Sequence, residues 1–340
     1  MQPQITNENR LKYILIAMSV LLLVWFGVRE ITMLTAPVAP GNNHIVEIEI
    51  PPSSSTARVA QILSENDLIR SQTMFRLSCR LFGYDNRLQA GYYQFKPSMN
   101  MMQIVEEIVK GQVVALSMTI PEGYTLQEIG NVLIQKGICS KTEWNQALLK
   151  DYDFDFLNGI PMRENRLEGF LFPDTYRFQK GVDANQVIML MLRRFDEVWQ
   201  RQFAAEAEAK GMTPYGVLTI AAMVEKEALF DAERPRISGV MYNRIGKGML
   251  LQVDATVIYA LGRHIERVTY ADLKIDSPYN TYRYAGMPPG PIASPGAASI
   301  EAALHPEQHN FLYYVAMKDG HHTFTRTYNE HLQAKQKNRE

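Results

Sequence analysis

The 340-residue sequence predicts an α+β protein that is carried behind an N-terminal transmembrane helix. Three observations predict this fold: a long apolar run near the N-terminus, a strand–helix–helix–strand pattern that occurs twice, and a largely helical C-terminal half. A chain of this length is expected to form two or three domains. The formal net charge of −1 gives no electrostatic reason to expect binding to nucleic acid.

The apolar run extends from Tyr13 to Val28, and further apolar residues up to Leu34 bring it close to the ~20 residues that cross a bilayer. A cleaved signal peptide is the alternative. Against it, the run is long, contains Trp25 and is not followed by a clear small-residue cleavage site before Pro37. We therefore expect an uncleaved anchor.

The basic residues Arg10 and Lys12 precede this run, which favours a cytoplasmic N-terminus. The expected order is a cytoplasmic tail at 1–12, a transmembrane anchor at 13–34 and a linker at 35–45. Because the linker is rich in Pro, Gly and Asn, we expect it to lift the folded part off the membrane. The remainder of the chain then lies outside the cytoplasm.

An internal repeat organises the region after the linker. The segment IPPSSSTARVAQILSENDLI from Ile50 aligns with IPEGYTLQEIGNVLIQKGIC from Ile120, and likeness between the segments from Tyr93 and Tyr176 extends it. Each copy predicts a strand, two helices, a strand and a further helix. Chance likeness of two short α+β stretches is the alternative. Small units of this shape suit binding better than chemistry.

Between the halves of the second copy lies an aromatic turn, LEGFLFPDTY. Phe170 and Phe172 are expected to pack in the core, whereas the roles of Glu168 and Asp174 stay open between structure and a sugar-binding cleft.

Helices are expected to dominate the chain from Ala184 onward. One amphipathic helix begins near Gln186 and continues through AAEAEAK to Gly211, and a second is capped by Thr213 and reaches about Phe230. A third extends from Arg236 to Arg244. Near the C-terminus, FLYYVAM and HHTFTRT flank a Lys-Asp-Gly turn and predict a hairpin.

The helix after Thr213 carries the residues most suggestive of chemistry, in the sequence MVEKEA. Its 100° step places Glu225 and Glu227 on opposite flanks of an apolar face, and Thr219 with Lys226 on a polar edge. A carboxyl group in apolar surroundings resists ionisation and can act as a general acid near neutral pH. A solvated helix end is the alternative, and periodicity does not choose between the two acids.

The remaining polar residues indicate neither a metal site nor a cofactor site. Cys79 and Cys139 fit no metal-ligand spacing and are expected to be buried thiols, with a disulfide as the alternative. The seven histidines form no HExxH motif or Cys/His cluster. We therefore expect no metal and no cofactor.

Several long motifs occur in a characteristic order, from roughly Val46 to His331. They are a GYYQF segment, TIPEGYTLQEI, EGFLFPDTY, MVEKEA, ERPRISGVMYNRIGKGMLLQVDATVIYALG, SPYNTYRYAGMPPGPIASPGAASIEAALHP and HTFTRTYNEH. In these motifs the chain closely resembles the membrane-anchored endolytic murein transglycosylases, the YceG-like (MltG) proteins. One departure is Val253 in QVDATV, where the family suggests a small polar residue such as Thr.

The resemblance implies cleavage of peptidoglycan glycan strands between N-acetylmuramic acid and N-acetylglucosamine. It implies that Glu225 is the catalytic acid, and that a LysM-like β-α-α-β subdomain at 46–115 precedes a mixed α+β catalytic domain at 116–340. A second LysM-like unit would then occupy about 116–190. The expected partners are glycan strands and the inner membrane, with peptidoglycan synthases as further candidates.

One carboxylate is sufficient for a lytic transglycosylase, because the 6-hydroxyl of the sugar attacks the anomeric carbon and closes a 1,6-anhydro ring. We expect Gln252, Asp254, Asn280 and Tyr282 to hold the glycan. Glu227 is expected to be structural and ion-paired with Arg236 or Arg244. The alternatives are a muramidase-type hydrolase, with Asp254 as its second carboxylate, and a non-catalytic peptidoglycan-binding scaffold.

Overall fold

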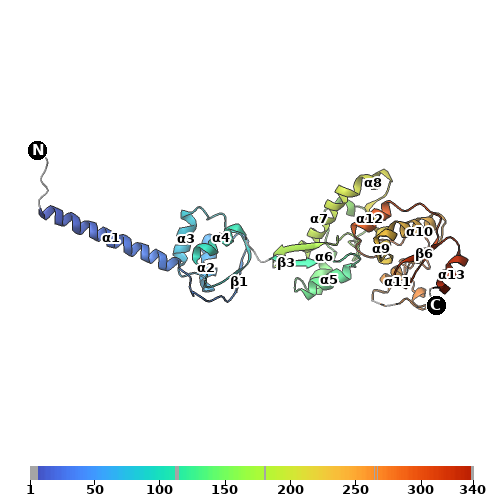
Figure 1. Ribbon diagram of the computed structural model, residues 1–340, viewed down its shortest axis with the longest axis horizontal. Helices are drawn as coiled ribbons and strands as arrows, with labels where there is room; N and C mark the ends of the chain where they lie inside the picture. The colour runs from blue at the N-terminus through green and yellow to red at the C-terminus, as the bar shows by residue number, and fades with distance from the viewer. Residues whose placement is uncertain (1–6, 112–114, 180, 264, 266, 338–340) are drawn as a thin grey trace. The chain divides into compact units, whose positions relative to one another are not determined.

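Helices are the main secondary structure of the computed structural model, which describes residues 7–111, 115–179, 181–263, 265 and 267–337 (Figure 1). Within these ranges the strands form two-stranded pairs, and the α+β class is confirmed. The pairs are β1 (Val46–Ile50) with β2 (Gly91–Phe95), β3 (Ala115–Thr119) with β4 (Thr175–Gln179), and β5 (Tyr313–Ala316) with β6 (His322–Thr325).

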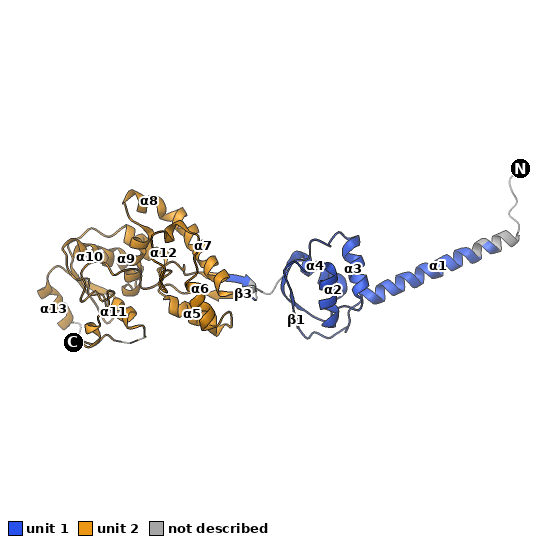
Figure 2. Cartoon of the chain, turned by 180° about the vertical axis from the view of Figure 1, so that it is seen from behind, with its two compact units in different colours: residues 1–116, 177–181 blue, residues 117–176, 182–340 orange. Residues whose placement is uncertain are grey.

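The chain divides into two compact units (Figure 2). Unit 1 comprises Met1–Leu116 and Arg177–Gly181, and unit 2 comprises Ser117–Tyr176 and Val182–Glu340.

The N-terminal helix of unit 1, α1 (Asn7–Thr35), contains the apolar run. Its segment Leu15–Thr35 is 21 residues long and, by length and composition, suffices to cross a membrane. The first six residues of the expected cytoplasmic tail lie outside the described residues.

The segment after α1 is bonded to the folded part of unit 1, and its role as a linker that lifts this part off the membrane stays a prediction. The guanidinium of Arg70 donates to the carbonyl oxygen of Pro37 (3.0 and 2.7 Å) and to that of Val38 (2.9 Å). The N–H of Ala39 donates to the carbonyl of Pro97 at 3.1 Å. These bonds hold the end of α1 against the folded part of unit 1.

The folded part of unit 1 packs helices on the antiparallel β1–β2 pair. The alternation of the strands turns Ile48 and Tyr93, which lie opposite each other, into the core. The helices are α2 (Thr56–Glu65), α3 (Gln72–Leu81) and α4 (Met101–Lys110). Cys79 of α3 is a buried free thiol, as expected, and burial raises its pKa to about 11. Cys139 is also free but only half-buried.

The same order of elements occurs again after β3, as the repeat predicts. The second copy consists of β3, α5 (Leu126–Gln135), α6 (Lys141–Leu148), β4 and α7 (Ala184–Gln202). Equivalent positions in the two copies also have the same capping role or the same backbone conformation. Ser55 and Thr125 cap α2 and α5, and Ser53 and Gly123 both have positive φ, at 61° and 76°. The LysM-like assignment of these units stays a prediction.

Unit 2 is organised around α9 (Pro214–Glu227), which contacts α8 (Ala204–Ala209), α10 (Arg234–Gly246), α11 (Asp254–Leu261) and α12 (Ala297–Leu304). The expected cap is present, since the hydroxyl of Thr213 accepts the N–H of Gly216 at 3.1 Å. The expected polar edge at Thr219 is wrong: every residue from 217 to 224 is buried. This helix is therefore the core of unit 2, and not a surface helix.

Two other helix boundaries differ from the prediction. The helix expected to continue to Gly211 is interrupted at Phe203, whose backbone turns out of the helical region (φ −127°) while its ring is buried near Trp199. The third expected helix begins earlier, at Arg234. The predicted C-terminal hairpin is confirmed as the antiparallel β5–β6 pair, and α13 (Tyr328–Lys337) follows it.

Gly239 allows α10 to approach the segment that follows α12. A Cβ atom at this position would lie 2.4 Å from the backbone carbonyl oxygen of Glu307. We expect Gly239→Ala to lower the free energy of unfolding by about 1–3 kcal/mol, because backbone atoms must shift. Gly246→Ala, at the open end of the same helix, has no atom within 4 Å and serves as the control. Equal denaturation midpoints for the two variants would contradict this prediction.

Candidate active site

Glu225 lies in the last turn of α9, with its side chain 7% exposed. One carboxylate oxygen, Oε2, accepts the N–H of Gly296 at 3.0 Å, and Oε1 lies 3.2 Å from Nη1 of Arg234. Gly296 is the N-cap of α12, so the carboxylate meets the positive end of a helix dipole. Two long-range contacts therefore fix the orientation of this buried acid.

Arg234 opens α10 and is itself held from several sides. Its side chain is 8% exposed; Nε donates to Asp231 at 2.9 Å, and Nη1 donates to the hydroxyl of Ser299 at 2.5 Å. The guanidinium is therefore a pre-organised cation beside Glu225.

A second carboxylate, that of Glu122, lies in the same site. It follows β3, and its loop is bound to the segment before α12, because Gly123 donates to the carbonyl of Ser294 at 2.8 Å. A Cβ atom on Gly296 would lie 1.9 Å from Oε1 of Glu122, so the absence of a side chain there makes room for this carboxylate. Burial, and then the charge of Glu225, raise the pKa of Glu122, while Arg234 opposes this shift.

The sequence prediction missed Glu122 and Arg234 as members of the site. A signal for Glu122 exists in the repeat: Glu122 stands where the first copy has Pro52, directly before the turn residue with positive φ. An acidic residue at this position in one copy alone distinguishes the two copies chemically. For Arg234 the sequence offers only its place in the motif ERPRISG.

Glu227 faces a different environment on the opposite flank of α9. Its carboxylate accepts the hydroxyl of Tyr314 at 3.1 Å, and burial raises its pKa to about 7. The predicted ion pair with Arg236 or Arg244 is wrong. Arg236 pairs with Glu307 at 3.0 Å, and Arg244 donates to backbone carbonyls.

Two of the four residues expected to hold the glycan, Asp254 and Tyr282, lie near Glu227. Tyr282 donates to Asp254 at 2.5 Å, and the charge of Asp254 adds to the raised pKa of Glu227. Exposed Gln252 has φ +54° and accepts a 3.4 Å bond from Arg244. Contact of these residues with a glycan stays a prediction.

Asn280 differs from the other three because it is fully buried. Its amide donates to the carbonyls of Leu273 and Ile275, at 2.9 and 2.8 Å. In the structure its side chain supports the loop that carries Tyr282, and its contact with a glycan likewise stays a prediction.

The aromatic turn is a packing element. Phe170 and Phe172 are buried, as expected, and Asp174 forms an ion pair with Arg194 at 2.7 Å. Glu168 is buried and accepts the N–H of Leu126 at 3.1 Å and the hydroxyl of Tyr259 at 3.0 Å.

Glu168 predicts a pH dependence of stability. Burial raises its pKa to about 8, whereas the unfolded chain releases this proton near pH 4.5. Between pH 4.5 and pH 8 the unfolded state binds fewer protons than the folded state, so the free energy of unfolding falls as the pH rises. We expect Glu168→Gln, which cannot ionise, to gain roughly 2–4 kcal/mol relative to wild type between pH 5 and 8. Exposed Glu164→Gln is the control, and a constant difference in melting temperature across this window would refute the prediction.

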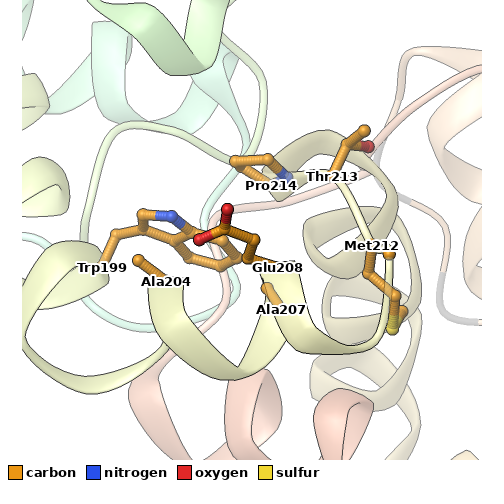
Figure 3. A pocket seen from close by; sticks show the side chains of 8 residues that line it. Trp199, Ala204, Ala207, Glu208, Met212, Thr213 and Pro214 are labelled. Carbon is orange, nitrogen blue, oxygen red and sulfur yellow. The ribbon is translucent and has the colours of Figure 1, made fainter.

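A pocket of about 390 Å³ lies at the other end of α9 (Figure 3). It is lined by Trp199, Ala204, Ala207, Glu208, Gly211, Met212, Thr213 and Pro214. With a rise of 1.5 Å per residue, Pro214 and Glu225 are separated by about 16 Å along the helix, so this pocket is not the site of Glu225. Within the described ranges, no group of three or more His, Cys, Asp or Glu could hold a metal ion.

Comparison with known proteins places the chain in a family. The model of the YceG-like family matches residues 48–337. An endolytic murein transglycosylase from Bacillus subtilis is 35% identical over 320 residues, which cover 89% of this chain and 88% of that protein. An endolytic murein transglycosylase from Streptococcus pneumoniae is 30% identical, over 86% of this chain and 58% of that protein. A crystal structure of a YceG-like protein from Listeria monocytogenes aligns with a TM-score of 0.58 and 35% identity, covering 86% of this chain and 99% of that chain. The chain therefore belongs to the YceG-like family.

Proposed function

We propose that this protein is a peptidoglycan lytic transglycosylase that cleaves glycan strands internally and leaves 1,6-anhydro-N-acetylmuramic acid ends. The observation that carries the proposal is the buried Glu225, oriented by Arg234 and by the N–H of Gly296 on the central helix of the catalytic unit. The family relationship supports the same activity, because the similar proteins are named endolytic murein transglycosylases.

In the proposed mechanism, Glu225 first donates its proton to the glycosidic oxygen and the bond to the anomeric carbon breaks. As a carboxylate, Glu225 then accepts the proton of the 6-hydroxyl, whose oxygen attacks the anomeric carbon. The second step needs a carboxylate that is already positioned. Arg234 and the N-terminus of α12 supply that positioning and stabilise the charge as it forms.

A muramidase-type hydrolase is the second candidate, and Glu122 is the observation that favours it. A hydrolase needs a second carboxylate to activate water or to act as a nucleophile. The structure brings Glu122 close to Glu225, whereas Asp254 binds Tyr282 on the side of Glu227. Glu122 is thus a better candidate for that second carboxylate than Asp254.

The proposed function includes a membrane topology. We place α1 across the cytoplasmic membrane with the N-terminus in the cytoplasm, so the catalytic unit acts outside it on nascent strands as a terminase of glycan elongation. The apolar segment Leu15–Thr35 and the basic residues before it support this arrangement. Peptidoglycan synthases are the partners this position implies, and the LysM-like units at 46–115 and about 116–190 would contact the glycan.

The decisive test is the mass of the products from purified glycan strands. Lytic cleavage yields fragments that are one water lighter than those from hydrolysis. Anhydro ends support the proposal, while reducing ends would establish the hydrolase. A wild-type protein that releases no fragments, but is retained on peptidoglycan, would overturn both and indicate a binding scaffold.

A further inference from the structure

The outward face of α3 combines apolar and basic side chains. Leu77, Leu81 and Phe82 are 46%, 74% and 59% exposed, although each is large and apolar. Arg76 and Arg80 lie one turn apart on the same exposed side. The helix contains no acidic residue, and within the described part of the chain neither arginine forms an ion pair.

The helix α3 lies at the end of the apolar helix. α1 contacts α3, and Figure 1 shows α3 on the side of unit 1 from which α1 departs. Arg70, one residue before the N-cap Ser71 of α3, binds the carbonyls of Pro37 and Val38 directly after α1. The distance between α3 and the end of α1 is therefore set by direct contacts.

The length of the apolar segment of α1 determines how close α3 lies to the membrane. The 21 residues of Leu15–Thr35 rise by about 31 Å, close to the ~30 Å of a bilayer's hydrocarbon core. With Leu15–Thr35 across the bilayer, as proposed, Thr35 lies at the edge of the hydrocarbon. Arg29 and Glu30 then lie about 7–9 Å inside that edge, from where long charged side chains extend to the headgroups. The headgroup layer outside this edge is roughly 5–8 Å thick, so an element that touches the end of α1 lies within it.

We propose that α3 is an interfacial helix that docks on the outer surface of the membrane spanned by α1. Leu77, Leu81 and Phe82 enter the boundary between headgroups and acyl chains, and Arg76 and Arg80 bind the phosphates of anionic phospholipids. The inference rests on the proposed membrane anchor. Docking at two points, α1 and α3, restricts how unit 1 can tilt against the membrane.

The composition of the face favours lipid over a protein partner. Interfacial helices combine apolar residues with Lys or Arg, and the arginine side chains can extend their charged ends to the phosphates while their stems cover apolar surface. A protein partner would have to supply acidic residues opposite Arg76 and Arg80, whereas anionic phospholipids offer negative charge across the whole membrane surface.

The experiment uses the full-length protein in nanodiscs that contain anionic phospholipid. In a Cys139→Ser background, single cysteines carry an environment-sensitive fluorophore at Leu81→Cys, at Leu23→Cys inside α1 and at Glu106→Cys, an exposed position of α4. Buried Cys79 stays, and the unmodified background checks that it does not react. Quenching by nitroxide lipids and by aqueous iodide reports the depth of each fluorophore.

We expect the Leu81 fluorophore to be quenched by headgroup-level nitroxides and to show severalfold less iodide quenching than the Glu106 fluorophore. If the Leu23 fluorophore is buried in lipid while Leu81 and Glu106 are equally open to iodide, the anchor stands and the inference fails. If the Leu23 fluorophore is also open to iodide, the anchor itself fails. The scaffold protein around the disc is the same in every sample, so protection at Leu81 that changes with lipid composition comes from lipid.

A second comparison tests whether the arginines bind lipid phosphates. It also shows whether lipid or the chain itself protects Leu81 from iodide. The Arg76→Gln/Arg80→Gln variant, or purely zwitterionic nanodiscs, should increase iodide quenching at Leu81, whereas Lys110→Gln on α4 should not. Protection at Leu81 that is unchanged by lipid charge and by the double variant would overturn the assignment of these arginines to phospholipid headgroups.

Discussion

Replacing Glu225 with Gln is expected to lower the rate of glycan cleavage by about 10²–10⁴-fold, because the amide can neither donate the first proton nor accept the second. The substitution keeps the shape of the side chain, and its carbonyl oxygen can still accept the N–H of Gly296. Folding should therefore persist, and circular dichroism with a thermal unfolding curve checks this. The rate is measured as release of soluble fragments from purified strands.

The matched control for this prediction is Glu227→Gln, two residues away on the same helix. Glu227 is bonded to Tyr314 on the opposite flank of α9, so we expect its loss to change the rate by less than about tenfold. A Glu225→Gln protein that is as active as wild type would exclude Glu225 as the catalytic acid. A greater loss in the Glu227 variant would instead move the site to the other flank.

The local elements of this fold follow closely from local sequence signals. Thr213 with Pro214 predicts the start of α9, and the hydroxyl does cap the helix. The repeated Ile-Pro segments predict two β-α-α-β units, and even the turn with positive φ is shared by Ser53 and Gly123. These features depend on residues within one or two turns of each other, so the sequence contains the information that determines them.

The environment of the candidate acid could not be predicted in this way. Glu225, Arg234, Glu122 and Gly296 come from four separate segments, and only tertiary packing brings them together. The periodicity of α9 predicted a polar edge at Thr219 and Lys226, although the helix is buried on every side from 217 to 224. Periodicity identifies one apolar face of a helix. It does not reveal that the other faces are also buried when these carry small residues, or polar residues such as Thr219, whose hydroxyl bonds to the carbonyl of Tyr215 within the same helix.

The segment that follows α1 is a second case in which composition alone does not predict tertiary contacts. Its Pro, Gly and Asn content indicates irregular structure, and irregular structure is present. Composition does not reveal that Arg70, more than thirty positions away, binds its carbonyl groups and fixes it to unit 1.

Replacing Arg234 with Met is expected to destabilise the protein and to abolish catalysis. The guanidinium is almost fully buried among Glu225, Asp231 and Ser299, so its removal leaves a buried carboxylate without its cation. Breaking such a buried pair costs about 3–5 kcal/mol in the free energy of unfolding. Arg236→Met is the control, because its pair with Glu307 is partly exposed and should be worth about 1 kcal/mol or less.

A double-mutant cycle separates the ion pair from simple loss of packing. In Arg234→Met/Glu225→Gln the orphaned charge is gone, so the double variant should be more stable than Arg234→Met alone by about 1–3 kcal/mol, measured by denaturant unfolding at neutral pH. Strictly additive losses would show that the two side chains do not interact in solution. In that case Arg234 could not be the group that holds the Glu225 carboxylate for the second proton transfer, and the proposed mechanism would lose its positioning residue.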